Sequence, residues 1–358
     1  MIPIHDQAGL EALRKRVRFD PRAVRRMRSL FLRSYSGAGA ALGALPETGR
    51  DAFAREVRFH ELEQVGVRHS DHDGASKLLF RTASGESLES VILRIKTGRS
   101  SLCVSSQTGC AGGCLFCATG RLRGVRNVSV AEMLDQVVQA GELLRSEGRP
   151  LRNVVFMGMG EPFHNEDNLF AALGELCSPR GFHLSGKHCL VSTMGIPSGI
   201  RRLSRDFPRV GLAVSVHTVR QEVRDELMPL TRRWPLPELR TAIVERSAVF
   251  GQPVMIEVLM LDGVTDTGAD CFALKEWLAG LQAHVNLIPY NPPPESVSVA
   301  CCRGRPLRAS TEGRVAAFLA DLKAAGYKAT LRHSLGADIQ AACGQLAETG
   351  QEVVLNSE

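Results

Sequence analysis

The chain has 358 residues, of which 44% are hydrophobic and 23% charged, a composition typical of a soluble globular protein. This length is enough for one large domain with a smaller attachment. The sequence contains no run of about 18 apolar residues, which argues against a membrane span. The first residues, MIPIHDQAGLEALRKR, lack the apolar segment of a secretory signal. We therefore expect a cytoplasmic protein with no membrane partner.

Positive charge is concentrated near the N-terminus. The net charge is +6, and the segment from Arg14 to Arg33 contains nine basic residues against one acid, Asp20. A basic block of this kind favours contact with nucleic-acid phosphates and salt-sensitive binding. The same pattern is also typical of a solvated helical face, so charge alone leaves both interpretations open.

The first hundred residues predict a small extension with two parts. Residues 8–35 have a helical, basic pattern, whereas residues 36–50 are rich in Gly, Ala and Pro and are predicted to be a linker. From about Glu61 short alternating runs predict antiparallel strands, with a polar turn at Ser84 and Gly85.

After Ser101 the chain alternates between apolar strands and helices. Ser129 and Glu132 have the spacing of a capping box at the start of one helix, and another helix is predicted over 311–325, before Gly326. The strand segments are SLCVS (from Ser101), NVVFM (from Asn153), HCLVS (from His188), GLAVSV (from Gly211), VMIEVLML (from Val254), HVNLIPY (from His284) and KATLR (from Lys328).

Repeated strand-helix units predict an α/β fold with a parallel sheet and right-handed crossovers. Six or seven units are too few for a closed eight-fold barrel but suit an open, partial (β/α)6-type barrel, with the chemistry at the carboxyl ends of the strands. The expected regions are a basic helical accessory region over 1–60, a β-rich extension over 61–100, the partial barrel over 101–347 and a C-terminal tail over 348–358.

The stretch GCAGGCLFCATG places Cys110, Cys114 and Cys117 in the pattern C-x3-C-x2-C, directly after the first strand of the barrel. Three thiolates on a tight, glycine-bearing loop are typical ligands of an iron-sulfur cluster. A 4Fe-4S cluster held by three cysteines keeps one iron open for a small molecule. A zinc site would require a fourth ligand at regular spacing, and the sequence offers no matching second C-x2-C or His pair.

This spacing is the signature of the radical S-adenosylmethionine (SAM) superfamily, whose fold is also a partial barrel. The resemblance implies that the open iron binds the amino and carboxylate groups of SAM. One electron from the cluster then cleaves SAM to a 5′-deoxyadenosyl radical. A 4Fe-4S cluster and SAM are therefore the expected cofactors.

Small polar residues follow several predicted strands. The strand from Asn153 runs into MGMGEP, where Gly160 permits close backbone approach and Glu161 places a carboxylate at the strand end. The strand ends also carry Ser192, Ser215, His217 and Asn291, where a barrel site is expected. Each of these residues alone is also typical of an ordinary cap, turn or hydrogen-bonding histidine.

Two further cysteines flank the barrel region. Cys343 lies in GADIQAACGQL, and Cys103 lies seven residues before Cys110. Both are compatible with ordinary buried cysteines, or with a nucleophile and its resolving partner.

Taken together, these stretches resemble the RlmN/Cfr family of radical SAM RNA methyltransferases. The matching segments are CVSSQTGCAGGCLFCATG, FMGMGEP, VSTMGI, SVHT, LMPL, VNLIPYNP and DIQAACGQL, in this order over about residues 86–347. The resemblance implies cluster ligation by Cys110, Cys114 and Cys117, and SAM contacts from Gly160, Glu161, Ser192, Ser215, Val216, His217 and Asn291. It also implies that Cys343 carries the methyl group, that Cys103 is its disulfide partner, and that Glu89 is a candidate proton acceptor.

In this family one SAM methylates the cysteine by displacement, and a second generates the radical that activates the S-methyl group. The resemblance thus implies a methyltransferase that acts on carbon 2, or carbon 8, of an adenosine in 23S-like ribosomal RNA and possibly transfer RNA. It also implies a monomer that receives electrons from a donor such as flavodoxin or ferredoxin. GEP resembles RlmN, whereas FCATG and RNVSV resemble Cfr.

Three alternatives remain open from the sequence. The first is a divergent radical SAM enzyme that methylates a substrate other than RNA. The second is a radical enzyme of another class, acting on a peptide or small molecule, which would have no need for the pair Cys103 and Cys343. The third is a non-catalytic iron-sulfur or zinc protein that binds RNA.

Overall fold

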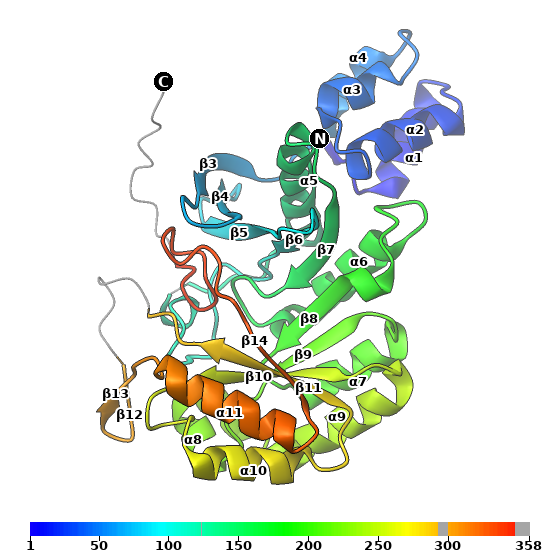
Figure 1. The fold of residues 1–358 in the computed structure, drawn as a ribbon. Helices are drawn as coiled ribbons and strands as arrows, with labels where there is room; N and C mark the ends of the chain where they lie inside the picture. The colour runs from blue at the N-terminus through cyan, green and yellow to red at the C-terminus, as the bar shows by residue number, and fades with distance from the viewer. Residues whose placement is uncertain (123, 293–299, 348–358) are drawn as a thin grey trace.

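A ten-stranded sheet runs through the chain in the order β14-β11-β10-β9-β8-β7-β6-β5-β4-β3 (Figure 1). The structure is a computed structural model that describes residues 1–122, 124–292 and 300–347. The predicted tail over 348–358 lies outside these ranges. None of the described helices combines the length and apolar character of a membrane span.

Seven neighbouring strands of this sheet are parallel. Their interiors are apolar; Val154, Val191, Val214, Ile256 and Val285 have no exposed surface. The predicted α/β partial barrel is confirmed, because the two outer parallel strands do not pair with each other. The strands are β6 (Ser100–Cys103), β7 (Leu151–Phe156), β8 (Cys189–Thr193), β9 (Gly211–Ser215), β10 (Val254–Met260), β11 (Ala283–Pro289) and β14 (Lys328–Leu331).

Helices connect these strands and pack along the outside of the curved sheet (Figure 1). The predicted capping box is present: Ser129 Oγ accepts from the Glu132 amide at 3.2 Å, and Glu132 Oε2 accepts from the Ser129 amide at 2.8 Å. The last helix ends before Gly326, as predicted. The helices are α5 (Val130–Ser146), α6 (Glu166–Cys177), α7 (Pro197–Asp206), α8 (Gln221–Leu227), α9 (Leu236–Phe250), α10 (Gly268–Leu278) and α11 (Glu312–Ala324).

The predicted antiparallel strands continue the same sheet. They are β3 (Glu63–His69), β4 (Ala75–Arg81) and β5 (Ser87–Arg94), and β5 pairs antiparallel with β6. The expected boundary between residues 100 and 101 falls within β6, so one sheet crosses it. Two short strands, β12 (Cys301–Cys302) and β13 (Arg305–Pro306), form a separate hairpin after β11.

The N-terminal residues form four helices and one small parallel pair, β1 (Ile2–Pro3) with β2 (Val57–Arg58). The prediction of a linker over 36–50 was wrong, because α3 occupies residues 37–43 and buries Ala41 completely. Contact with α2 stabilises this Gly- and Ala-rich helix, whose local sequence favours a loop. The helices are α1 (Gln7–Arg16), α2 (Pro21–Leu32), α3 (Gly37–Gly43) and α4 (Arg50–Glu56).

This helical region is attached to the barrel by specific polar contacts. The buried Asp135 carboxylate on α5 accepts from the amides of Glu61 and Leu62 at 2.7 and 2.8 Å. Arg28 on α2 forms an ion pair with Glu175 on α6. Because both ion-pair partners are largely shielded from solvent, breaking the contact would leave a poorly solvated charge.

Tyr35 packs against α5 at Gly141, so replacement by alanine should have opposite effects on stability at two helical glycines. A Cβ atom at Gly141 would lie 2.3 Å from the Tyr35 ring, whereas a Cβ at Gly174 on α6 would meet nothing within 4 Å. Gly141→Ala should destabilise the protein by about 1–3 kcal/mol through overpacking. Gly174→Ala should stabilise it by up to about 1 kcal/mol through helix propensity. Chemical denaturation of both variants measures this, and equal effects would contradict the packing.

Candidate active site

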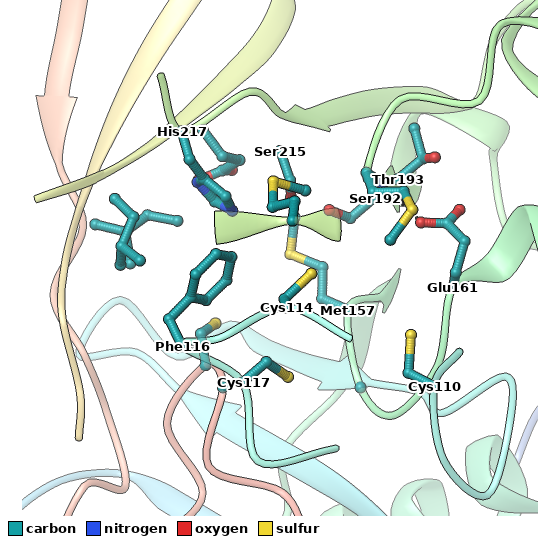
Figure 2. A pocket seen from close by; sticks show the side chains of 18 of the residues that line it. Cys110, Cys114, Phe116, Cys117, Met157, Glu161, Ser192, Thr193, Ser215 and His217 are labelled. Carbon is teal, nitrogen blue, oxygen red and sulfur yellow. Dashed lines mark hydrogen bonds between the residues drawn. The ribbon is translucent and has the colours of Figure 1, made fainter. Parts of the chain in front are cut away.

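One loop between β6 and α5 presents three sulfurs to a pocket at the carboxyl ends of the parallel strands. Figure 2 shows Cys110, Cys114 and Cys117 on this loop, facing Ser192, Ser215 and Glu161 from the strand ends. The loop is tied on two sides by backbone hydrogen bonds. The Leu115 amide donates to the Leu227 carbonyl at 2.9 Å, and the Ala118 amide donates to the Gly344 carbonyl at 2.7 Å.

Gly112 shapes the space around the first two sulfurs. A Cβ atom there would lie 2.5 Å from Met194 Cε, 3.2 Å from Cys110 Sγ and 3.7 Å from Cys114 Sγ. The Gly112 amide also donates to Cys110 Sγ at 3.3 Å. Only glycine therefore leaves this side of the sulfurs open, and its N–H group points at one of them, as in iron-sulfur sites.

The three thiols are poorly suited to an ordinary protein interior. Burial raises the pKa of the Cys110 thiol to about 12 and also raises the pKa values of Cys114 and Cys117. Bound metal supplies the positive charge that a buried thiolate requires. Within the described ranges no three His, Cys, Asp or Glu side chains converge as they would on a single ion. A 4Fe-4S cluster fits this arrangement, since each cysteine then binds a different iron.

Glu161 lies at the end of β7, where Gly160 brings the backbone close to Gln107. A Cβ at Gly160, which has φ +99°, would lie 2.6 Å from Gln107 Cβ. The Glu161 carboxylate accepts from the amides of Phe163 and Met194 at 3.0 and 2.7 Å. Burial nevertheless raises the pKa of Glu161 to about 7. A cationic group in the pocket would offset this cost, as expected for an acid that binds an ammonium.

Three further residues at or near strand ends line the same pocket: Ser192 near the end of β8, Ser215 at the end of β9, and Asn291 after β11. Ser192 lies within β8 next to Thr193, which the sequence did not single out. Parallel strands bring their carboxyl ends to one edge of the sheet, so residues far apart in the chain meet there.

His217 is buried and adopts a left-handed backbone conformation with φ 61°. Its ring meets the Phe116 ring edge-on at a centroid distance of 4.8 Å. Burial and the nearby Arg224 lower the pKa of His217 to about 3, so the ring is neutral. Val216, the neighbouring predicted SAM contact, has no exposed surface and does not line the pocket.

Cys343 lines the pocket on a segment that returns from β14. Asn291 Nδ2 donates to the Cys343 carbonyl at 3.5 Å. Cys103, the last residue of β6, is buried behind this surface and does not line the pocket. Burial raises the pKa of Cys103 to about 12, and the nearby Cys343 raises it further. Both cysteines are free thiols.

The sequence reasoning missed Arg332 and Glu257, which line the pocket near Cys343. Negative charge at Cys343 raises the pKa of Arg332, and burial raises the pKa of Glu257. Arg332 follows β14 directly, so the rule that strand ends carry the chemistry could have identified it. Glu257 lies inside β10, where the surrounding apolar residues gave no such signal.

Glu89 lies on β5 and does not line the pocket. It forms an ion pair with Lys77 on β4 at 3.3 Å, and each side chain is only 1% exposed. Lys77 Nζ also donates to the Gln340 carbonyl at 3.4 Å, three residues before Cys343. Glu89 is thus connected through Lys77 to the segment that carries Cys343.

Comparison of the chain with known proteins identifies the family to which it belongs. Residues 104–270 match the radical SAM superfamily. The chain is 45% identical to a probable RNA methyltransferase of Rhodopirellula baltica, over 94% of this chain and 85% of that protein. It is 42% identical to the dual-specificity RNA methyltransferase RlmN of Syntrophobacter fumaroxidans, over 81% and 82% of the two chains. The chain belongs to the RlmN family of radical SAM RNA methyltransferases.

A solved structure similar to this chain is a radical SAM methyltransferase from Sphaerobacter thermophilus, with TM-score 0.87 and 36% identity over 96% of this chain and 99% of that chain. Both the family resemblance and the fold class inferred from the sequence are confirmed. As a radical SAM protein, this RlmN-family member uses a 4Fe-4S cluster and SAM.

The raised pKa of Glu161 predicts a pH-dependent stability of the apoprotein. The folded state holds this proton up to about pH 7, whereas the unfolded carboxyl loses it near its usual pKa of 4.5. Because the folded state retains a proton that the unfolded state releases, the free energy of unfolding falls progressively as pH rises from 4.5 to 7. Glu161→Gln removes this titration, so its unfolding free energy relative to wild type should rise by about 3 kcal/mol between pH 4.5 and 8.

Anaerobic denaturant titrations across this pH range measure that difference. The exposed Glu47→Gln variant controls for the loss of one carboxylate. A pH-independent difference between Glu161→Gln and wild type would show that the carboxyl titrates normally.

Proposed function

We propose that this enzyme transfers a methyl group from SAM, through the sulfur of Cys343, to carbon 2 or carbon 8 of an adenosine in RNA. The observation that carries the proposal is that Cys343 lines the same pocket as the three-cysteine loop and Glu161. A thiol at this position is exposed to both the methyl donor and the cluster side of the pocket. Radical SAM enzymes that do not transfer a methyl group through a cysteine would not require a thiol at this position.

We assign the cluster to Cys110, Cys114 and Cys117, whose buried sulfurs require metal charge. We assign SAM to Gly160, Glu161, Ser192, Ser215, Val216, His217 and Asn291, of which all except Val216 line the pocket. When bound, the cluster and SAM supply radical chemistry that activates a methyl group. Val216 contributes only through its backbone, because its side chain is buried.

In this proposal Cys343 is the methyl carrier, and Cys103 releases the product by forming a disulfide with it. The buried position of Cys103, beside Cys343 but behind the pocket surface, suits a thiol that acts only after methyl transfer. Arg332 and Cys343 line the same pocket, so the guanidinium lies on the surface where the methyl donor and the Cys343 sulfur would meet.

Glu89 is proposed as the acceptor of the proton that the adenine ring loses. Its carboxylate forms an ion pair with Lys77 at 3.3 Å. Glu89 does not line the pocket, so it would act through movement of the Cys343 segment or through water. The resemblance of GEP to RlmN favours carbon 2, and the Cfr-like segments keep carbon 8 as the second candidate.

The family resemblance implies a 23S-like ribosomal RNA as the substrate, with transfer RNA as the second candidate. Exposed Arg22, Arg25 and Arg26 of α2 extend the surface available for phosphates beyond the barrel. We further propose a cytoplasmic monomer that receives electrons from a small donor protein such as flavodoxin or ferredoxin. The β-rich extension and the helical region act with the barrel as one catalytic unit.

The methyl-carrier role of Cys343 predicts that RNA methylation and cluster assembly respond differently to its removal. Cys343→Ala should abolish methylation of RNA while the protein still assembles its cluster, because the three ligand cysteines remain. Mass spectrometry of RNA incubated with reconstituted enzyme, reductant and labelled SAM reports the methylated carbon. Cys271→Ala, which removes a buried cysteine on α10 that does not line the pocket, should retain both readouts. Methylated RNA from Cys343→Ala, or methylation only of non-RNA substrates by wild type, would refute the proposal.

The disulfide role predicts a different defect for Cys103→Ala. This variant should still transfer the methyl carbon to the base, but it cannot displace the thioether bond between Cys343 and RNA. A covalent protein–RNA adduct should therefore accumulate and migrate slowly in a denaturing gel. Digestion of the RNA should remove the shift, and free methylated RNA at the wild-type rate would argue against the assignment.

A further inference from the structure

A fully buried arginine lies beneath the cluster loop. Arg224 on α8 has no exposed surface, yet the described residues contain no carboxylate within ion-pair distance of it. Burial lowers the pKa of Arg224 to about 10, which leaves it charged at neutral pH. An uncompensated buried cation is costly, so its surroundings must supply negative charge or strong dipoles.

Two of its arms bind carbonyl groups at the ends of neighbouring strands. Arg224 Nη2 donates to the Met194 carbonyl at 2.6 Å, and Nε donates to the Val216 carbonyl at 3.3 Å. Met194 follows β8, two residues after the proposed SAM contact Ser192, and Val216 follows β9, directly after Ser215. One guanidinium therefore fixes two of the strand ends that form the pocket.

The same helix also supports the cluster loop. The Leu227 carbonyl, at the end of α8, accepts from the Leu115 amide at 2.9 Å, between two of the three cysteines. The third arm of Arg224, Nη1, is buried without a hydrogen-bond partner among the described residues. Cys114 is the group whose negative charge most favours the charged form of Arg224. Arg224 is thus tied to the loop by geometry, because its helix binds Leu115 and its Nη2 binds Met194, whose side chain lies against Gly112.

We propose that Arg224 is a positioning residue whose buried charge stabilises the reduced cluster while its two bonded arms hold the strand ends around SAM. This inference rests on the cluster assignment proposed above. Reduction adds one electron, and therefore one negative charge, to a cluster already ligated by three thiolates. A nearby cation in a medium of low dielectric constant favours the more negative state and so raises the reduction potential.

The charge and the hydrogen-bond geometry can be separated by substitution. Arg224→Lys keeps the charge but loses the planar fork, whereas Arg224→Gln and Arg224→Met remove the charge. Arg246 on α9 provides a matched control, because it is also fully buried and donates to the carbonyl groups of Val210 and Pro208. These carbonyls precede β9, at the end of the strand away from the pocket.

The measurement is an anaerobic redox titration of the reconstituted full-length protein without SAM, followed by electron paramagnetic resonance, together with iron and sulfide content. Arg224→Gln and Arg224→Met should disfavour cluster reduction by on the order of tenfold, or about 59 mV for one electron. Arg224→Lys should stay close to wild type. Arg246→Gln should lower thermal stability without moving the potential.

An unchanged potential in both uncharged variants would overturn the inference, and so would an equal shift in Arg224→Lys. If the uncharged variants do not fold, Arg224→Lys alone tests the inference. A changed reduction potential in this variant, which retains the charge, would exclude a charge effect. Absence of a cluster from wild type would instead refute the cluster assignment. The two failures are therefore distinguishable.

Discussion

Three thiols buried at the carboxyl ends of parallel strands can ionise only if positive charge replaces the water that they lack. Burial alone opposes ionisation of Cys110, Cys114 and Cys117, so the loop is arranged for metal rather than for ordinary packing. The rest of the site follows from this constraint. Gly112 leaves space beside the sulfurs, and backbone bonds to Leu227 and Gly344 hold the loop from two sides.

Burial in this site affects acidic and basic side chains alike, because it disfavours the charged form of each. Burial opposes ionisation of Glu161, although it accepts two backbone amide bonds. Arg224 retains its charge with no ion-paired carboxylate among the described residues, and His217 is held neutral. Each of these costs falls when a ligand of complementary charge enters, so occupancy of the pocket and stability of the fold are thermodynamically linked.

The fold could be predicted from the sequence because apolar periodicity and helix caps are local signals. All seven parallel strands appear where apolar runs predicted them, and Ser129 caps its helix as its spacing indicated. Most of the predicted site residues meet because strand order alone brings strand ends together. Tertiary contacts decided the rest. The helix α3 replaces an expected linker, and Arg224 on a short helix resembles a solvated charge until its burial is known.

The segment that carries Cys343 is bound to three separate parts of the chain. The Gly336 amide donates to Asp73 at 2.8 Å, Thr119 Oγ1 donates to the Leu346 carbonyl at 2.5 Å, and Gln345 Nε2 donates to the Pro292 carbonyl at 3.0 Å. Those anchors belong to the antiparallel extension, the cysteine loop and the end of β11. The antiparallel extension thus helps to fix the position of the Cys343 sulfur from a distance, through the contact of Asp73 with Gly336. Loosening the β3–β4 turn would give that sulfur a wider range of positions without altering any group in the pocket itself.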